Sequence, residues 1–184
     1  MNTDTALLII DVQKAFQAPS WGNRNNPQAE DNMLRILEVC RNQGWTIIHI
    51  RHRSENEQSR FYIHHEGFEP QTGFEATAGE KVIEKEVNSA FIGTDLQAYL
   101  TLLQIKHVVI IGLTTPHCVS TTTRMSGNLG YQTYLVEDAT AAFDLVDHHG
   151  QLIDAEQVHQ LTLATLHDEF STVLCTDELL KNIQ

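Results

Sequence analysis

Three residues whose side chains could together carry out nucleophilic chemistry stand at the ends of short apolar runs. Asp11 ends the run in "LLIIDVQ", Lys85 ends "KVIEK", and Cys118 follows the run in "HVVIIGLTTPHC". A thiolate is a strong nucleophile, a carboxylate can accept the thiol proton, and an ammonium group stabilises the negative charges that result. The three residue types therefore suit covalent attack on an electrophilic carbon.

Each member of this trio also has a plainer interpretation. A lone cysteine is usually a small buried residue, an aspartate after a strand can cap a turn, and a lysine is by default a solvated charge. Composition alone does not decide between these readings. The choice depends on whether the secondary-structure elements bring Asp11, Lys85 and Cys118 together.

Short apolar runs alternate with helical patterns along the chain. The expected buried strands are 6–10, 46–50, 108–111 and 133–136, with 81–85 and 171–174 as weaker candidates. The expected helices lie within 28–44, 93–104, 119–130 and 154–170, with Thr94 and Asp154 as N-caps of the second and fourth. This alternation predicts an α/β fold, a three-layer doubly wound, Rossmann-like and mostly parallel sheet of about six strands with helices on both faces.

In such a sheet, sites form in the crevice at the carboxyl ends of the strands. Asp11, Lys85 and Cys118 would then converge at one edge. Cys118 also precedes the segment "VSTTTRMSGNLG", which is predicted to be helical, so unpaired backbone N–H groups could hold an oxyanion beside it. The threonines of that segment are weak helix formers, which indicates that tertiary packing decides its conformation.

The composition is that of a soluble globular protein with a single domain over residues 1–184. A formal net charge of −12 argues against a surface that binds nucleic acid or anionic membranes. From the segment "MNTDTALLII" we expect neither a signal peptide nor a membrane span at the amino terminus. Three widely spaced cysteines, at positions 40, 118 and 175, form no disulfide framework or zinc motif, so a cytoplasmic location is expected.

The segment 51–80 interrupts the alternation and is longer than an ordinary connection. We interpret it as a functional loop that borders the site. Aromatic and polar residues near the strand ends are the candidates for a pocket that binds a flat or partly apolar small molecule. They are Gln13, Phe16, Trp21, Phe61, Phe91 and His117, and each is individually compatible with core packing or a loop role.

Four blocks of the sequence resemble the isochorismatase-like cysteine hydrolases, which include nicotinamidases, isochorismatases, carbamoylsarcosine-type amidohydrolases and a streptothricin hydrolase. The blocks are "LLIIDVQKAF" (7–16), "VIEKEVNSAFIGTDL" (82–96), "IIGLTTPHCVSTTTR" (110–124) and "GYQTYLVEDATAAF" (130–143). They occur in the family order and spacing, and the resemblance extends from about residue 5 to 175.

The resemblance implies that Asp11, Lys85 and Cys118 form the family's catalytic triad. In that family the cysteine attacks an sp² carbon of an amide, and water then hydrolyses the acyl-enzyme. A non-proline cis peptide is implied at Leu113–Thr114, with the backbone N–H groups of Thr114 and Cys118 directed at the oxyanion. The family also forms oligomers, commonly dimers or tetramers.

The sequence departs from the nicotinamidase pattern in one respect. Those enzymes carry an Asp-x-His pair after the second strand that binds a metal, whereas the corresponding stretch here is "HIRHRSE" (49–55). We therefore expect no metal and no cofactor, with His52 and the histidine pairs 64–65 and 148–149 as structural or surface residues. Two alternatives to amide hydrolysis remain open: hydrolysis of an isochorismate-like vinyl ether, and a binding domain that lost catalysis.

Overall fold

A parallel sheet forms the centre of the computed structural model, which describes residues 4–183. In this part of the chain, six strands hydrogen-bond in the order β3-β2-β1-β4-β5-β8, and each neighbouring pair is parallel. Their bounds are β1 Thr5–Ile10, β2 Thr46–His52, β3 Lys81–Lys85, β4 His107–Leu113, β5 Gln132–Ala141 and β8 Thr172–Leu174. All six predicted strands are confirmed. Residues 1–3 and 184, the ends of the predicted domain, lie outside the described residues.

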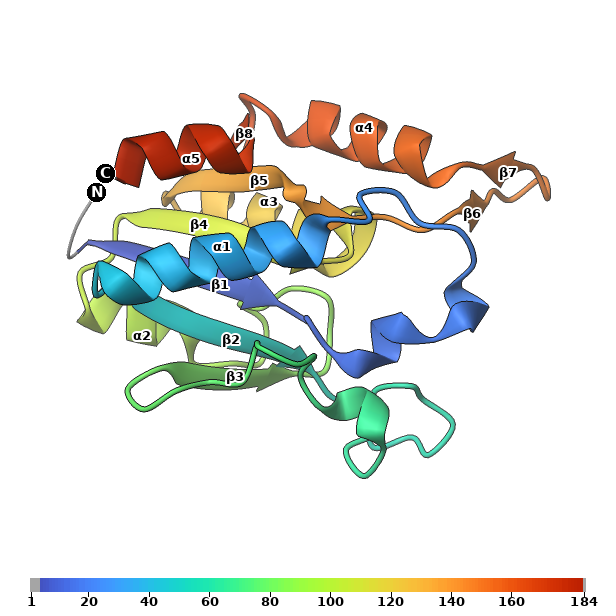
Figure 1. Ribbon diagram of the computed structural model, residues 1–184, viewed down its shortest axis with the longest axis horizontal. Helices are drawn as coiled ribbons and strands as arrows, with labels where there is room; N and C mark the ends of the chain where they lie inside the picture. Colours follow the sequence, from blue (N-terminus) through green and yellow to red (C-terminus); the bar gives the residue numbers. More distant parts are fainter. Residues whose placement is uncertain (1–3, 184) are drawn as a thin grey trace.

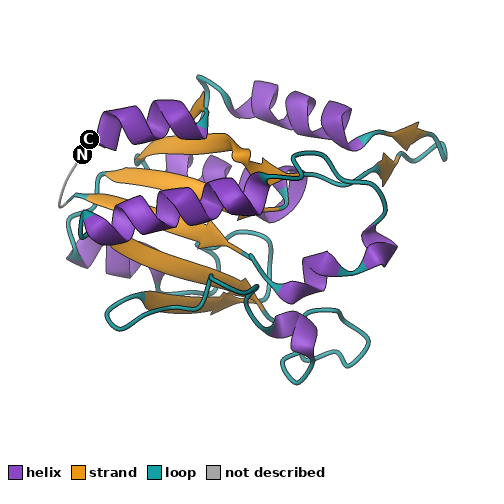
Figure 2. Ribbon diagram, in the orientation of Figure 1, coloured by secondary structure: helices purple, strands orange, loops and turns teal. Residues whose placement is uncertain are grey.

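Helices cover both faces of this sheet, which confirms the predicted three-layer architecture (Figure 1). Figure 2 shows the strands enclosed between the two helical layers. The α-helices are α1 Ala29–Asn42, α2 Leu96–Leu102, α3 Ser120–Asn128, α4 Ala155–Leu166 and α5 Thr176–Ile183. Helices α1 and α5 pack on one face, and α2, α3 and α4 pack on the other.

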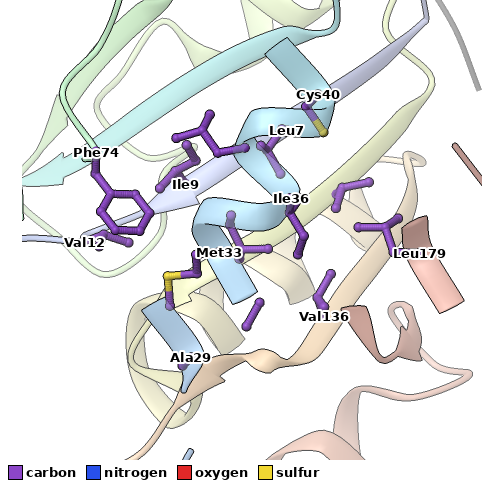
Figure 3. Packing of buried hydrophobic residues seen from close by; sticks show 14 of the residues in the cluster. Leu7, Ile9, Val12, Ala29, Met33, Ile36, Cys40, Phe74, Val136 and Leu179 are labelled. Carbon is purple, nitrogen blue, oxygen red and sulfur yellow. The ribbon is translucent and has the colours of Figure 1, made fainter. Parts of the chain in front are cut away.

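The central strand β1 is buried on both faces. Leu7 and Ile9 pack with α1 residues such as Met33 (Figure 3), whereas Leu8 and Ile10 pack on the opposite side with α2 and α4. All four β1 side chains are at most 2% exposed. This two-sided burial explains why the strand reads as a continuous apolar run rather than an alternating one. Among residues 4–183, no helix is long and apolar enough to span a bilayer.

The structure differs from the sequence expectations at several element ends. Asp154 caps α4 as predicted, because its carboxylate accepts a hydrogen bond from the Gln157 N–H at 3.0 Å. Thr94 is not the N-cap of α2; that position belongs to Asp95, and Thr94 lies in the preceding turn. Helix α5 and the antiparallel hairpin of β6 (Leu145–Val146) and β7 (Leu152–Ile153) were not predicted.

A partly buried ion-pair network joins α1 and β2 to the turn before β3. Arg41 Nε donates to Glu80 at 2.7 Å, the Thr77 N–H donates at 2.8 Å, and His49 Nε2 lies 2.8 Å from the same carboxylate. Burial alone would raise the pKa of Glu80, but these hydrogen bonds outweigh it and hold the pKa below its usual value. Burial also lowers the pKa of His49. Burial therefore favours a neutral His49, although the adjacent Glu80 opposes this, and the hydrogen bonds favour an ionised Glu80.

We expect the free energy of unfolding to decrease as the pH falls below neutrality. The unfolded chain takes up protons that the folded chain excludes, first at His49 as the pH passes its usual value of 6.5, and then at Glu80 below 4.5. Urea denaturation midpoints between pH 7.5 and 4 measure this effect. His49→Gln should flatten the upper part of the profile, although the buried His159 also contributes there. An unchanged slope between pH 7 and 5.5 in that variant would contradict the assignment.

Candidate active site

Four polar side chains gather at the carboxyl edge of the sheet because their strands end side by side. Asp11 follows β1 directly, His52 is the last residue of β2, and Lys85 is the last residue of β3. The register pairs His52 with Lys85 across the β2–β3 ladder. Cys118 follows β4, which lies on the other side of β1, within the π-helical turn η4 (Thr115–Val119) that continues into α3. The fold therefore brings Asp11, Lys85 and Cys118 together.

Lys85 is the centre of this group. Its Nζ donates to Asp11 Oδ2 at 2.7 Å and to Cys118 Sγ at 3.3 Å, and it lies 3.1 Å from His52 Nδ1. Asp11 is fully buried, Lys85 is 1% exposed and Cys118 is 7% exposed. A lysine is seldom buried so deeply unless its charge is paired, so this ammonium group belongs to the site and not to the surface.

Burial raises the pKa of the Cys118 thiol to about 12, and the negative charge of Asp11 adds to this, while Lys85 opposes it. At neutral pH the free protein therefore holds Cys118 as a thiol. Cys40 has a similar pKa, raised by burial alone, and lies on α1 in the core cluster between that helix and the sheet. What distinguishes Cys118 is a neighbouring carboxylate, because an Asp11 oxygen lies within 4.8 Å of Sγ. Asp11 Oδ1 is also buried and has no hydrogen-bond partner within the described chain.

The backbone at Asp11 turns sharply out of β1. Asp11 has a φ of 50°, its N–H donates to the Ile50 carbonyl at 2.9 Å, and its carbonyl accepts from the Gln13 N–H at 2.8 Å. Aspartate is one of the few residues other than glycine that visit this left-handed region readily. This local conformation directs the carboxylate toward Lys85.

The segment before the cysteine follows a path that depends on Gly112. This residue has a φ of 128°, and a Cβ placed on it would lie 2.1 Å from the Ile10 carbonyl oxygen. The Leu113–Thr114 peptide bond is cis, which confirms the expectation from the resemblance. The N–H groups of His117 and Val119 then donate to the Thr114 carbonyl, at 3.1 and 3.4 Å.

Tertiary contacts explain why the start of α3 is rich in threonine. Thr122 is fully buried and its Oγ1 accepts a hydrogen bond from the Ala90 N–H at 3.1 Å. This bond attaches the loop that follows Lys85 to the helix that follows Cys118. Thr123 donates to the Val119 carbonyl at 2.8 Å, so its hydroxyl is satisfied within the helix. Packing and local hydrogen bonds thus override weak helix propensity here, as expected.

A cavity of about 190 Å³ opens above the thiol. It is lined by Asp11, Phe16, Trp21, His52, Phe61, Asn88, Thr114, His117 and Cys118. Phe16 packs against Trp21 and Phe61, with ring centroids 5.1 and 5.2 Å apart, and forms an aromatic wall. A larger hollow of about 1040 Å³ lies near Asp4 and Lys106, at the opposite edge of the sheet, and includes none of the Asp–Lys–Cys group.

Four of the six residues predicted for the pocket line this cavity: Phe16, Trp21, Phe61 and His117. Phe61 comes from the 51–80 loop, which therefore borders the site. Gln13 and Phe91 lie elsewhere, which corrects their predicted placement. Gln13 is 1% exposed and its amide binds backbone groups, and Phe91 stacks on Tyr131 at 6.0 Å.

Sequence reasoning missed two cavity residues, His52 and Asn88. His52 could have been found by the criterion that identified Asp11 and Lys85, because it also ends a buried strand; the predicted strand was two residues too short. Asn88 had no such signal, since it lies in an irregular turn after β3.

The side chains of Asp11, His52 and Cys118 offer ligand atoms that lie within 4.8 Å of one another, close enough to consider a metal ion. However, the Lys85 ammonium contacts all three side chains. A metal ion at this position would have to displace a buried, hydrogen-bonded charge of the same sign. These residues therefore fit an internal ammonium group and do not fit a metal centre.

Comparisons with known proteins agree with this architecture. The sequence model of the isochorismatase domain matches residues 5–178. The uncharacterized isochorismatase family protein YrdC of Bacillus subtilis (strain 168) is 53% identical over 182 residues, covering 99% of this chain and 97% of that protein. Nicotinamidase 3 of Arabidopsis thaliana is 26% identical over 192 residues, covering 97% of this chain and 88% of that protein.

The similarity extends to three dimensions. The crystal structure of an isochorismatase-family protein from Chromobacterium violaceum ATCC 12472 superimposes with a TM-score of 0.96 at 39% identity, covering 99% of this chain and 94% of that one. The strand order, the strand-end residues and the sequence match from residue 5 to 178 lead to one assignment. The chain belongs to the isochorismatase family of hydrolases.

Proposed function

We propose that this hydrolase cleaves a carbon–nitrogen amide bond in a small molecule, with Cys118 as nucleophile, Asp11 as base and Lys85 as their electrostatic partner. The observation that carries the proposal is the buried contact of one ammonium group with both a carboxylate and a thiol on the wall of a cavity. Few structural roles would justify burying these three groups together.

The reaction follows from the positions of these groups. Asp11 takes the Cys118 proton while Sγ forms a bond to the amide carbon, and the Thr114 and Cys118 N–H groups receive the oxyanion. When the intermediate collapses, the carbon–nitrogen bond breaks and the amine leaves with the proton from Asp11. Asp11 then takes a proton from water, whose oxygen attacks the thioester. Breakdown releases the acid, and the proton returns to Cys118.

The raised pKa of Cys118 supports the need for a neighbouring base. A thiol with a pKa of about 12 is almost entirely protonated at neutral pH, so spontaneous ionisation supplies little nucleophile. Transfer of the proton to Asp11 within the bound complex removes this barrier. Lys85, in contact with both partners, compensates whichever of them carries the negative charge.

The cavity supports a small, neutral and flat substrate. Its volume of about 190 Å³ is below the roughly 300–1,000 Å³ of pockets for drug-sized ligands. Among the described residues that line it there is no lysine or arginine, and the nearby Lys85 is already paired with Asp11. Arg60 lies over the Trp21 ring and Arg124 over the Phe170 ring. An anionic diacid of the isochorismate type would lack a counter-charge, and the similarity to a nicotinamidase also favours amide chemistry.

Three broader expectations belong to the same proposal. Residues 1–184 form one hydrolase domain, supported by a single six-stranded sheet with its two flanking cores. The protein acts in the cytoplasm, which is consistent with three free cysteines in the described chain. It assembles as a dimer or tetramer, for which the exposed apolar side chains of Val146, Leu152 and Leu161 offer contact area.

A panel of small amides tests the proposal. With a substrate from the panel, Cys118→Ser is expected to lower turnover by at least about 100-fold with unchanged thermal unfolding, and mass spectrometry should detect an acyl adduct on Cys118 of the native protein. Cys175→Ser, which changes a half-buried cysteine remote from the cavity, is the matched control. Full activity of Cys118→Ser on an amide or a vinyl ether would reject covalent catalysis. Absence of activity on every amide, with hydrolysis of an isochorismate-like vinyl ether, would favour the alternative chemistry.

A further inference from the structure

We propose that His52 is a substrate-binding residue of this site, a neutral imidazole that donates a hydrogen bond from Nε2 to an acceptor atom beside the carbon that Cys118 attacks. This inference rests on the proposed function for the identity of the nucleophile. It adds a substrate class, small flat amides with a hydrogen-bond acceptor next to the reacting carbon. No part of the Asp–Lys–Cys chemistry itself requires this contact.

His52 is held rigidly at the edge of the cavity. The Gln13 amide clamps both backbone groups of His52: its Nε2 donates to the His52 carbonyl at 2.9 Å and its Oε1 accepts from the His52 N–H at 2.8 Å. The same Nε2 donates to the Phe68 carbonyl at 2.9 Å. Gln13 thus joins the end of β2 to the 51–80 loop and fixes the position from which the imidazole projects.

The contact with Lys85 determines the tautomer of His52. An ammonium group has three N–H donors and accepts no hydrogen bond. Lys85 Nζ has three partners here, Asp11 Oδ2, Cys118 Sγ and His52 Nδ1. His52 Nδ1 must therefore be the acceptor, and the ring proton resides on Nε2. Burial, reinforced by the charge of Lys85, lowers the pKa of His52, so the ring is neutral at physiological pH.

The remaining nitrogen is available to a ligand. The His52 ring lines the cavity and packs against Phe61, with ring centroids 5.1 Å apart. Within the described chain, Nε2 makes no hydrogen bond, whereas all three protons of Lys85 are already engaged. Of the two strand-end residues His52 and Lys85, it is therefore His52 that has a side-chain proton available to a bound molecule.

Two substitutions of His52 test the contributions of its two ring nitrogens separately. In His52→Asn the side-chain amide lies near the position of Nδ1, where its oxygen can accept from Lys85, but no donor reaches the position of Nε2. In His52→Gln the longer side chain carries its NH₂ group near the position of Nε2. A donor to the ligand should therefore be lost in the first variant and retained in the second. His64→Asn, an exposed histidine of the same loop, is the control.

The test uses irreversible alkylation of Cys118, which needs no turnover. Iodoacetamide carries a carbonyl acceptor next to the carbon that sulfur attacks, and allyl iodide has similar size and the same leaving group without an acceptor. Rate constants for both are measured at matched pH by mass spectrometry of the Cys118 peptide. We expect His52→Asn to lower the rate constant of alkylation by iodoacetamide about tenfold relative to that by allyl iodide, the effect of one lost hydrogen bond. His52→Gln should recover most of the lost iodoacetamide reactivity. Equal effects on the two reagents in both variants would overturn the proposal.

Histidine labelled with ¹⁵N gives an independent readout of the tautomer. The His52 signals, identified by their loss in the variants, should show a protonated Nε2 and an unprotonated Nδ1 at pH 7. A proton on Nδ1, or an imidazolium, would also overturn the proposal. The two proposals can fail independently. A selective loss of iodoacetamide reactivity in His52→Asn supports the role of His52 even if no amide of the panel is cleaved. If an amide is cleaved but His52→Asn affects both alkylating reagents equally, amide hydrolysis stands and the role of His52 is rejected.

Discussion

Replacing Asp11 with asparagine is expected to lower turnover of the amide substrate by about 10²–10⁴-fold and, at the same time, to make Cys118 easier to ionise. The first effect follows from the proposed mechanism, in which Asp11 accepts the thiol proton. The second follows because the negative charge of Asp11 raises the pKa of Cys118, while Lys85, which lowers it, stays in place. Two opposite effects of one substitution are hard to explain by misfolding.

The measurement combines steady-state kinetics with the pH dependence of Cys118 alkylation by iodoacetamide. In Asp11→Asn the alkylation midpoint should move to lower pH while the catalytic rate falls. Asp144→Asn is a suitable control because Asp144 bonds to Asn23 near the protein surface. If the midpoint instead moved to higher pH, Asp11 would be acting as a structural anchor for Lys85 and not as the proton acceptor.

Gly112→Ala is expected to destabilise the protein by about 4 kcal/mol, enough to threaten folding of a domain of ordinary stability. The new Cβ would lie 2.1 Å from the carbonyl oxygen and 2.6 Å from the nitrogen of Ile10, both backbone atoms of the central strand β1. A rotamer change cannot relieve a contact between Cβ and backbone. The φ of 128° adds a conformational cost that alanine cannot avoid.

Gly79→Ala separates the steric cost of a new Cβ from the conformational cost of a positive φ. Gly79 has a φ of 93°, but no atom lies within 4 Å of a Cβ placed there. We therefore expect this variant to lose only ~1–3 kcal/mol, the usual cost of an unfavourable backbone conformation. Chemical denaturation of both variants measures the difference. Similar losses in the two proteins would show that the approach of β4 to β1 can relax.

The strands and the cluster of Asp11, Lys85 and Cys118 were predictable from the same features of the sequence. A strand buried on both faces must be a continuous apolar run, so its end is visible where the run stops, as at Asp11 after β1. Lys85 ends the edge strand β3, whose burial alternates and whose sequence signal is correspondingly weaker. Parallel pairing then brings those ends to one edge, whatever the connecting segments do. The cis bond at Leu113–Thr114 came from family resemblance, because no local pattern encodes it.

Other features depend on contacts that no local pattern reveals. Gln13 stands two residues after Asp11 and was expected in the pocket, yet its amide is consumed by the backbone of His52 and Phe68, 39 and 55 residues away. Phe91 follows Lys85 closely but turns toward Tyr131. The position of a side chain relative to a cavity depends on the direction of the turn that carries it, and strand and helix periodicity say nothing about that direction.

By itself, the sequence determined the sheet and its flanking helices and the three residues that meet at the sheet edge, because burial on two faces imposes apolar runs and parallel pairing aligns their ends. Only the tertiary structure decided which atoms share the Lys85 protons, since a hydrogen bond depends on distances of a fraction of an ångström between elements far apart in the chain. Within residues 4–183, that arrangement leaves Cys118 a thiol, Asp11 with one oxygen that accepts no hydrogen bond and His52 with a donor toward the cavity.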